Sequence, residues 1–205
     1  MERQAVVRRL SKIMFGGPLG TFAAKAMEKH NVDAEIEAIE TLAPAANHAV
    51  LAVGFGPGVG VERLLSRVPD GWVGGVDPSQ TMVNRARRRN AEAAASGRAV
   101  LKRADSTAIP WPDAAFDGAI SVNAIQFWHP LSTSAAEVAR VLQPGAKLVT
   151  FTHDWALTKG AGASVEEWAE STAETLRDAG FDDVAHWRGR AEDGRSYALT
   201  AVRHS

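Results

Sequence analysis

The sequence predicts an α/β fold, in which a doubly wound and mostly parallel sheet carries helices on both faces. Three observations predict it. From residue 46 onward, short apolar runs alternate five times with segments of helical periodicity, as in parallel strands joined by helices. A glycine-rich loop directly follows the first apolar run. The last two runs are joined by a link too short for a helical crossover, so the last strand is expected to pair antiparallel.

Seven strands are expected, because short apolar runs bounded by turn residues are typical of buried strands. They fall at 48–53, 71–76, 98–104, 116–122, 146–152, 183–188 and 197–202. Apolar residues at helical spacing predict helices between them, at 59–67, 79–95, 132–142 and 164–179. Together these elements predict a seven-stranded Rossmann-like sheet over residues 46–205.

The first 45 residues form a separate, helical extension in this prediction. Helices are expected at 5–14, 21–29 and 33–42, with a Gly-Gly-Pro-Leu-Gly break at 16–20, and Pro44 ends the segment. Its six basic and six acidic residues cancel. Two interpretations stay open: an appendage that completes the core, or a lid over an active site.

Composition and charge exclude several classes of protein. Hydrophobic residues make up 45% and charged residues 23% of the chain, which is typical of a globular domain. The absence of cysteine excludes disulfides and thiolate metal sites, and no histidine pair has metal-ligand spacing. No apolar run is long enough to span a membrane and no signal peptide is evident, so we expect a cytoplasmic protein without membrane insertion or bound metal.

One basic segment raises the question of nucleic-acid binding. Residues 79–103 hold seven basic residues and one acidic residue, but the net charge of the whole chain is −1. No aromatic residue interleaves with these charges to stack on bases. A solvated helix face is therefore favoured, and no nucleic-acid partner is expected.

The loop after the first strand is the first candidate binding site. Ligands of open α/β sheets bind at the carboxyl ends of the strands, and this loop carries Gly54, Gly56, Gly58 and Gly60 at alternate positions. Alternate glycines allow a tight turn and a close approach of a ligand to the backbone. The dinucleotide pattern Gly-x-Gly-x-x-Gly would need glycine at Val59, so a nicotinamide-dependent oxidoreductase is disfavoured. The spacing suits S-adenosylmethionine, which has no pyrophosphate.

Two carboxylates follow the next strands. Asp77, with Pro78 beside it, ends the second strand and can accept hydrogen bonds from both ribose hydroxyls of an adenosine; it can also cap the following helix. Asp105 follows the third strand and can bind the adenine amino group, while the backbone of Ser106 contacts the ring. The alternative for Asp105 is a turn residue before Pro110.

Four motifs in order resemble the class I S-adenosylmethionine-dependent methyltransferases. They are Val50-Leu-Ala-Val-Gly-Phe-Gly-Pro-Gly, Gly75-Val-Asp-Pro-Ser, Ala104-Asp with Ile109-Pro-Trp-Pro-Asp-Ala-Ala-Phe-Asp117, and Val141-Leu-Gln-Pro-Gly145. The resemblance covers about residues 46 to 153 and is strongest to the small-molecule branch that includes ubiquinone and menaquinone biosynthesis methyltransferases. It implies that Gly54, Gly56 and Gly58 flank the methionine portion of the cofactor and that Asn123 lies near its sulfonium.

The chain departs from that family at one position. The resemblance implies an acidic residue two positions before the first glycine, where this sequence has Ala52. The departure keeps a second hypothesis open: a protein that binds S-adenosylmethionine or S-adenosylhomocysteine for a non-methylating reaction, such as a cyclisation, or for regulation. The main prediction is methyl transfer to a small-molecule acceptor with S-adenosylhomocysteine as product. Monomer and homodimer both stay open.

Two histidines are candidates for a general base on the acceptor side. His129 follows the fourth strand and His153 the fifth, and both are expected at the ligand edge of the sheet. Each can equally be a turn residue. His153 is favoured, because Asp154, Trp128 and Trp155 could form an aromatic pocket around it.

Overall fold

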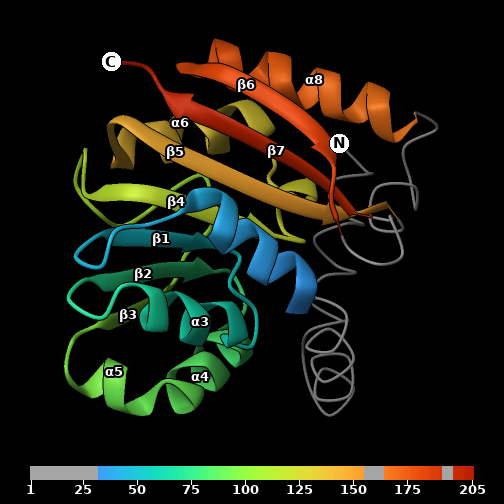
Figure 1. The fold of residues 1–205 in the computed structure, drawn as a ribbon. Helices are drawn as coiled ribbons and strands as arrows, with labels where there is room; N and C mark the ends of the chain where they lie inside the picture. The colour runs from blue at the N-terminus through green and yellow to red at the C-terminus, as the bar shows by residue number, and fades with distance from the viewer. Residues whose placement is uncertain (1–31, 155–163, 191–195) are drawn as a thin grey trace.

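The computed structural model describes residues 32–154, 164–190 and 196–205. Its core is one sheet of seven strands, with helices on both faces (Figure 1). The strands are β1 (Ala49–Val53), β2 (Trp72–Asp77), β3 (Ala99–Arg103), β4 (Phe116–Val122), β5 (Leu142–His153), β6 (Phe181–Arg188) and β7 (Ser196–Arg203). The helices described are one at 32–42, α3 (Val59–Arg67), α4 (Gln80–Arg89), α5 (Ala91–Ala95), α6 (Leu131–Val141), α8 (Val165–Asp178) and the 3-10 helix η1 (Ile125–Phe127).

The strand order is β3-β2-β1-β4-β5-β7-β6. Strands β1 to β5 pair in parallel, and β7 pairs antiparallel with both β5 and β6. The predicted doubly wound sheet with an antiparallel last strand is therefore confirmed. The order reverses at β1, because β2 and β3 lie on one side of it and β4 lies on the other. The loops after β1 and β4 therefore meet at a topological switch point.

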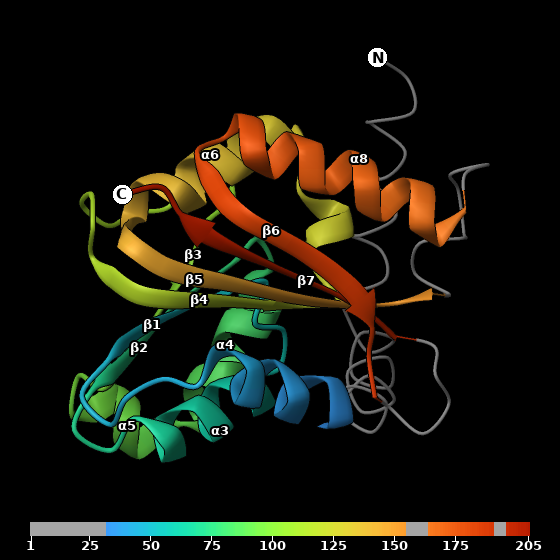
Figure 2. The ribbon, with the colours of Figure 1, turned by 45° about the horizontal axis from the view of Figure 1, so that its top comes forward.

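Helices cover both faces of the sheet (Figure 2), which separates two hydrophobic cores. Leu51 and Val53 of β1 pack toward α6 and α8, whereas Val50 and Ala52 pack toward α3 and the helix at 32–42. All five β1 residues are buried. Strands covered on both faces are apolar throughout, which is why they stand out in the sequence as continuous apolar runs.

The helix at 32–42, blue in Figure 1, packs on the sheet beside α3. Its buried side chains join the α3-side core, and Lys147 of β5 donates a hydrogen bond to the Thr41 carbonyl at 3.2 Å. These buried residues are Ala34, Ala38, Ile39 and Leu42. The predicted helices at 5–14 and 21–29 lie outside the described residues. The interpretation of residues 1–45 as a lid over the active site therefore stays a prediction.

Two element boundaries differ from the sequence predictions. The single helix expected at 79–95 is divided at Asn90, whose buried amide donates to the carbonyls of Ala86 (2.9 Å) and Gly58 (3.1 Å). β5 begins at Leu142 rather than 146, because Leu142 already pairs with Phe116 before a register shift around the Pro144-Gly145 turn. Among the described helices, none is both long and apolar enough to cross a bilayer.

Candidate active site

The glycine loop after β1 is held close to two neighbouring segments. Gly54 donates from its N–H to the Val76 carbonyl of β2 at 2.8 Å, which fixes the start of the loop against the next strand. A side chain on Gly54 would collide with Ala124, in the loop after β4. A Cβ on Gly58 would lie 2.6 Å from the Ala86 Cβ, and the φ of Gly58 is 91°. Only glycine fits at these two positions.

The glycine loop leads directly into α3, and Asn90, between α4 and α5, fixes the backbone of this loop. The Asn90 side chain donates to the Gly58 carbonyl, so that carbonyl points toward α4. The N-cap residue of α3 is Gly58, which has no side chain to cap the helix, so the first-turn amides of α3 are candidates for binding a ligand. Nothing in the sequence singled out Asn90, because its role depends on a contact between residues 32 positions apart.

Asp77 lies at the end of β2 and binds the same loop. Its Oδ2 accepts from the Gly56 N–H at 2.9 Å and its Oδ1 from the Ser79 N–H at 2.8 Å. The side chain is buried, and burial raises the pKa of Asp77 to about 6 although both backbone hydrogen bonds lower it. The carboxylate therefore retains lone pairs for further donors and stays ionised at neutral pH.

A hollow of about 340 Å³ lies at the ends of β2 and β3. Its lining residues are Pro78, Arg103, Ala104 and Asp105. Pro78 and Asp105 were both predicted to bind cofactor, so the structure brings these two residues to one hollow. A flat ring that enters it would meet aliphatic and peptide surface with a carboxylate at the rim.

Asp105 and Ser106 are neighbours whose side chains share one contact, 3.4 Å between the Ser106 hydroxyl and the Asp105 Oδ1, and otherwise have different partners. Asp105 Oδ1 lies 3.4 Å from both the N–H and the hydroxyl of Thr107, which forms a local turn. The Ser106 hydroxyl is buried and hydrogen-bonded to the Ser134 hydroxyl of α6 at 2.9 Å. The Ser106 side chain thus fastens the loop to α6, and the contact of its backbone with a ligand stays a prediction.

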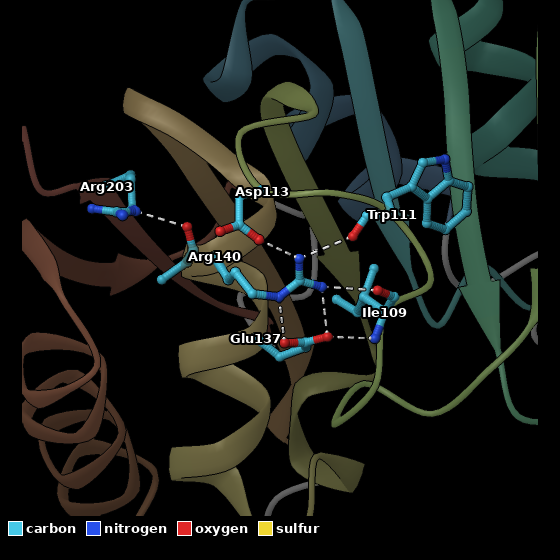
Figure 3. A network of polar contacts seen from close by, with 7 residues as sticks. Ile109, Trp111, Asp113, Glu137, Arg140 and Arg203 are labelled. Atoms are coloured by element: carbon cyan, nitrogen blue, oxygen red, sulfur yellow. Dashed lines mark hydrogen bonds and ion pairs between the residues drawn. The ribbon is translucent and has the colours of Figure 1, made fainter.

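An arginine network holds the rest of this loop (Figure 3). Arg140 of α6 donates to the carbonyls of Ile109 (3.0 Å) and Trp111 (2.9 Å) and to the carboxylates of Asp113 (2.7 Å) and Glu137 (2.8 Å). Its Nε and both terminal nitrogens are engaged, which uses all five N–H donors. Glu137 also accepts from the Ile109 N–H at 2.8 Å. Nothing in the sequence singles out this network, because Glu137 and Arg140 look like ordinary charges on a helix.

The loops after β4 and β5 meet at Asn123 and His153. The Asn123 Oδ1 accepts from the His153 N–H at 2.8 Å, and the Asn123 carbonyl accepts from the Gln126 side chain at 2.9 Å. Asn123 has a φ of 51° and is buried, as is His153. Because Ala124 contacts the Gly54 position, this pair of predicted site residues lies next to the glycine loop.

The other predicted acceptor-side residues are more scattered. His129 is exposed in the turn before α6, whereas Trp128 beside it is buried. Asp154 is ion-paired with Arg188 of β6 at 3.0 Å. Trp155 lies outside the described residues, so the aromatic pocket around His153 stays a prediction. In the ranges that the structure covers, no group of three or more potential metal ligands comes together.

Comparisons with known proteins agree with this geometry. A family model for a methyltransferase domain matches residues 50–145. The uncharacterized methyltransferase YdaC of Bacillus subtilis (strain 168) is 30% identical over 139 residues, which cover 66% of this chain and 72% of that relative. The chain belongs to the class I S-adenosylmethionine-dependent methyltransferases. This methyltransferase is also 32% identical over 108 residues to the O-methyltransferase cnsE of Penicillium expansum, but spans only 39% of its length.

The fold of the methyltransferase is also found in a solved structure. Phosphoethanolamine N-methyltransferase 2 of Haemonchus contortus, in complex with phosphomonomethylethanolamine and S-adenosylhomocysteine, superposes with a TM-score of 0.74. The match covers 94% of this chain and 59% of that chain at 15% identity, so the likeness concerns the fold alone. None of these three proteins is a quinone-biosynthesis enzyme by name, and that detail of the resemblance stays a prediction.

Ala52 is buried in the α3-side core of the methyltransferase. Its side chain points between the sheet and the helices that cover this face, so the position offers no charge to a ligand. The carboxylate that the family resemblance implies here is absent.

Proposed function

We propose that this protein transfers a methyl group from S-adenosylmethionine to a small-molecule acceptor and releases S-adenosylhomocysteine. The observation that carries the proposal is the buried Asp77 carboxylate, which accepts from the Gly56 N–H and directly precedes Pro78, a lining residue of the hollow at the ends of β2 and β3. A carboxylate at the end of β2 suits the two ribose hydroxyls of an adenosine, and the hollow beside it suits the adenine.

The residues of the site fit such a cofactor. Asp77 accepts from the ribose hydroxyls, and Asp105 accepts from the adenine amino group while Pro78 and Ala104 contact the ring. A Cβ on Gly56 would meet no atom within 4 Å, so the bare backbone there leaves space for the methionine portion over the loop. When bound, the cofactor supplies a methyl group on a sulfonium, which is already activated toward displacement.

The chain itself supplies alignment and proton handling. An in-line displacement needs an acceptor atom held opposite the sulfonium and shielded from water. Asn123 fixes the backbone of His153 at the β5 edge, next to the loop that holds the cofactor. His153 removes the proton of an acceptor hydroxyl or amine through its imidazole. We assign this role to His153 rather than to His129, because His129 is exposed in a turn.

The names of relatives support a small acceptor without fixing its atom. The relative cnsE is named an O-methyltransferase, and the Haemonchus enzyme holds phosphomonomethylethanolamine. Both names indicate small molecules, and they differ in the acceptor atom. We therefore propose a small-molecule acceptor and assign no acceptor atom to it.

A calorimetric panel tests the cofactor assignment. S-adenosylmethionine and S-adenosylhomocysteine are expected to bind, whereas NAD and NADP are expected not to, because the loop lacks the third glycine of the dinucleotide pattern. The Asp77→Ala variant is expected to lose about 2–4 kcal/mol of S-adenosylhomocysteine binding. Tighter binding of NAD than of S-adenosylhomocysteine would overturn the proposal.

Ala52 favours a second candidate, a non-methylating reaction that uses the same cofactor site. The two candidates differ in one product. Methyl transfer converts bound S-adenosylmethionine to S-adenosylhomocysteine in proportion to acceptor consumed, whereas a cyclisation or a regulatory role leaves the cofactor intact. Chromatography of the cofactor after incubation with an acceptor library separates them.

A further inference from the structure

Arg103 is the basic residue in the lining of the hollow at the ends of β2 and β3. It is the last residue of β3, and it pairs there with Asp77 in the parallel ladder. β3 is the edge strand of the sheet that the structure describes, so no further strand lies beside the hollow. A ring that enters the hollow therefore depends on side chains near the end of β3 for cover on its outer side.

One hydrogen bond anchors the Arg103 side chain to another lining residue. The Arg103 Nε donates to the Pro78 carbonyl at 3.3 Å, from β3 to the residue that follows β2. The guanidinium group is planar and Nε is part of that plane, so a bond at Nε restricts how the whole group is oriented. The side chain is exposed, and it makes no second hydrogen bond or ion pair with any described residue. Its terminal nitrogens therefore stay available to a ligand.

The neighbouring basic side chains are already engaged. Arg87 of α4 donates through its Nε to the Leu101 carbonyl of β3 at 3.1 Å. Lys102, which precedes Arg103, has its Nζ 4.2 Å from the centroid of the Trp111 ring. A cation over the face of an aromatic ring is attracted by the negative potential of that face. One basic side chain of β3 thus already binds a ring in this way, and Arg103 is the next basic residue along the strand.

A guanidinium group in the hollow can bind an anion through its N–H groups, or it can lie over a flat ring. Asp105 also lines the hollow, so an anionic ligand there would meet a like charge. Adenine is flat and uncharged, and its amino group can donate to that carboxylate. Pro78 and Ala104 add apolar surface to the same lining. The composition of the lining therefore favours an uncharged ring over a phosphate.

We propose that Arg103 covers the adenine ring of S-adenosylmethionine with the plane of its guanidinium group and contributes affinity that depends on the ring. The inference rests on the proposed function and deepens it at the adenine end of the site. Arg103 directly precedes the Ala104-Asp motif, so the motifs that resemble the methyltransferase family do not include it. A purely structural role of the bond to Pro78, as a tie between the ends of β2 and β3, predicts lower stability with unchanged ligand affinities.

Three ligands separate the ring from the rest of the cofactor. S-adenosylhomocysteine contains adenine, ribose and the amino-acid group, 5′-methylthioadenosine lacks the amino-acid group, and S-ribosylhomocysteine lacks the adenine. Arg103→Met keeps an unbranched side chain but removes the charged plane. It is expected to weaken S-adenosylhomocysteine and 5′-methylthioadenosine about fivefold each in calorimetric titrations. Binding of S-ribosylhomocysteine, measured by ligand-observed nuclear magnetic resonance, is expected to stay within about twofold, because no ring contact is lost.

Arg88→Met is the matched control, because Arg88 is exposed on α4 and its loss changes the net charge equally. It is expected to change none of the three affinities. A loss for S-adenosylhomocysteine but not for 5′-methylthioadenosine would place Arg103 at the amino-acid group. That outcome, unchanged affinities in Arg103→Met, or an equal loss in Arg88→Met would overturn the inference while the proposed function stands. If the unmodified protein binds neither adenine-containing ligand, the proposed function itself fails and the inference falls with it.

Discussion

Two opposing effects act on the Asp77 carboxylate. Burial raises its pKa to about 6, and the N–H groups of Ser79 and Gly56 lower it by less. The pKa in the folded protein thus lies above the ordinary value of 3.8. The folded state binds this proton more tightly than the unfolded state, so the contribution of Asp77 to the free energy of unfolding falls by about 3 kcal/mol as pH rises from about 4 through about 6. Ligand binding offsets this loss of stability, because only the ionised Asp77 carboxylate accepts hydrogen bonds from both ribose hydroxyls.

The pH dependence of cofactor binding follows from this pKa. Below about pH 6 the carboxylate is protonated, and S-adenosylhomocysteine affinity is expected to fall about tenfold for each further pH unit. The Asp77→Asn variant is expected to bind at least about tenfold more weakly at neutral pH and to lose this dependence. Calorimetric titrations across the range from about pH 5 to about pH 8 measure both.

Unfolding of the Asp77→Asn variant without ligand is the control for this prediction. Replacing the ionised group removes its burial cost but sets an amide N–H against one backbone donor, so the free energy of unfolding is expected to change by less than about 2 kcal/mol. A variant that keeps the wild-type pH profile would show that another group controls binding.

His153 and His129 form a natural pair for comparison on the acceptor side. With a hydroxyl or amine acceptor, His153→Gln is expected to lower turnover about a hundredfold or more and to leave S-adenosylhomocysteine affinity within about threefold, because a base acts on the acceptor and not on the cofactor. His129→Gln, in the exposed turn, is expected to retain turnover. Equal rates for wild type and His153→Gln, measured as S-adenosylhomocysteine release, would remove the base from the mechanism.

At the residue scale, the sequence predicted what lies in a local motif and missed what depends on tertiary contact. The glycines and Asp77 are each recognisable from a strand end and its following loop. Asn90 supports the same loop from 32 positions away, as counted from Gly58. No periodicity or spacing in one sequence reveals such partners.

Among the elements, the loop between β3 and β4 depends most on a single side chain. Arg140→Lys replaces five fixed donors by three and cannot reach two carbonyls and two carboxylates at once. The free energy of unfolding is expected to fall by about 2 kcal/mol, a figure that allows for the 32% exposure of this side chain. Urea unfolding monitored by circular dichroism measures it.

An exposed arginine provides the matched control for that loop. Arg177 of α8 pairs with Glu170 at 3.3 Å, and both side chains are about half exposed. Arg177→Lys is therefore expected to change stability by less than about 0.5 kcal/mol. A similar small effect for Arg140→Lys would mean that the loop is held by its apolar contacts instead.

The elements themselves were largely predictable, because both faces of the sheet are covered. Each parallel strand is a short apolar run, and α3 was predicted with the bounds that the structure has. The break between α4 and α5 was missed, since Asn90 ends α4 through a bond to the glycine loop. The early start of β5 was missed as well, because Pro144 and Gly145 read as a turn while Leu142 already pairs with Phe116.

In the whole molecule, the two hydrophobic cores lie on the two faces of the sheet, and the proposed ligand site lies at its edge, outside both cores. A ligand that binds only the folded state is expected to stabilise it by about 2.7 kcal/mol at a concentration of about 100 times its Kd. S-adenosylhomocysteine is expected to raise the thermal midpoint in this way, and NAD is expected to leave it unchanged. A midpoint that responds to NAD alone would contradict the cofactor assignment.

The reversed direction of β7 has a practical consequence for anyone who handles this protein. Ser196, at the start of β7, pairs with His153 at the ligand edge, whereas Val202 pairs with Lys147 near the opposite edge (Figure 1). The His204 N–H is tied there to the Gly180 carbonyl at 2.9 Å. Whatever is attached after Ser205 therefore leaves from the side away from the glycine loop. Tethering through that end would present the ligand edge to the solution, which suits surface-based screening for the acceptor.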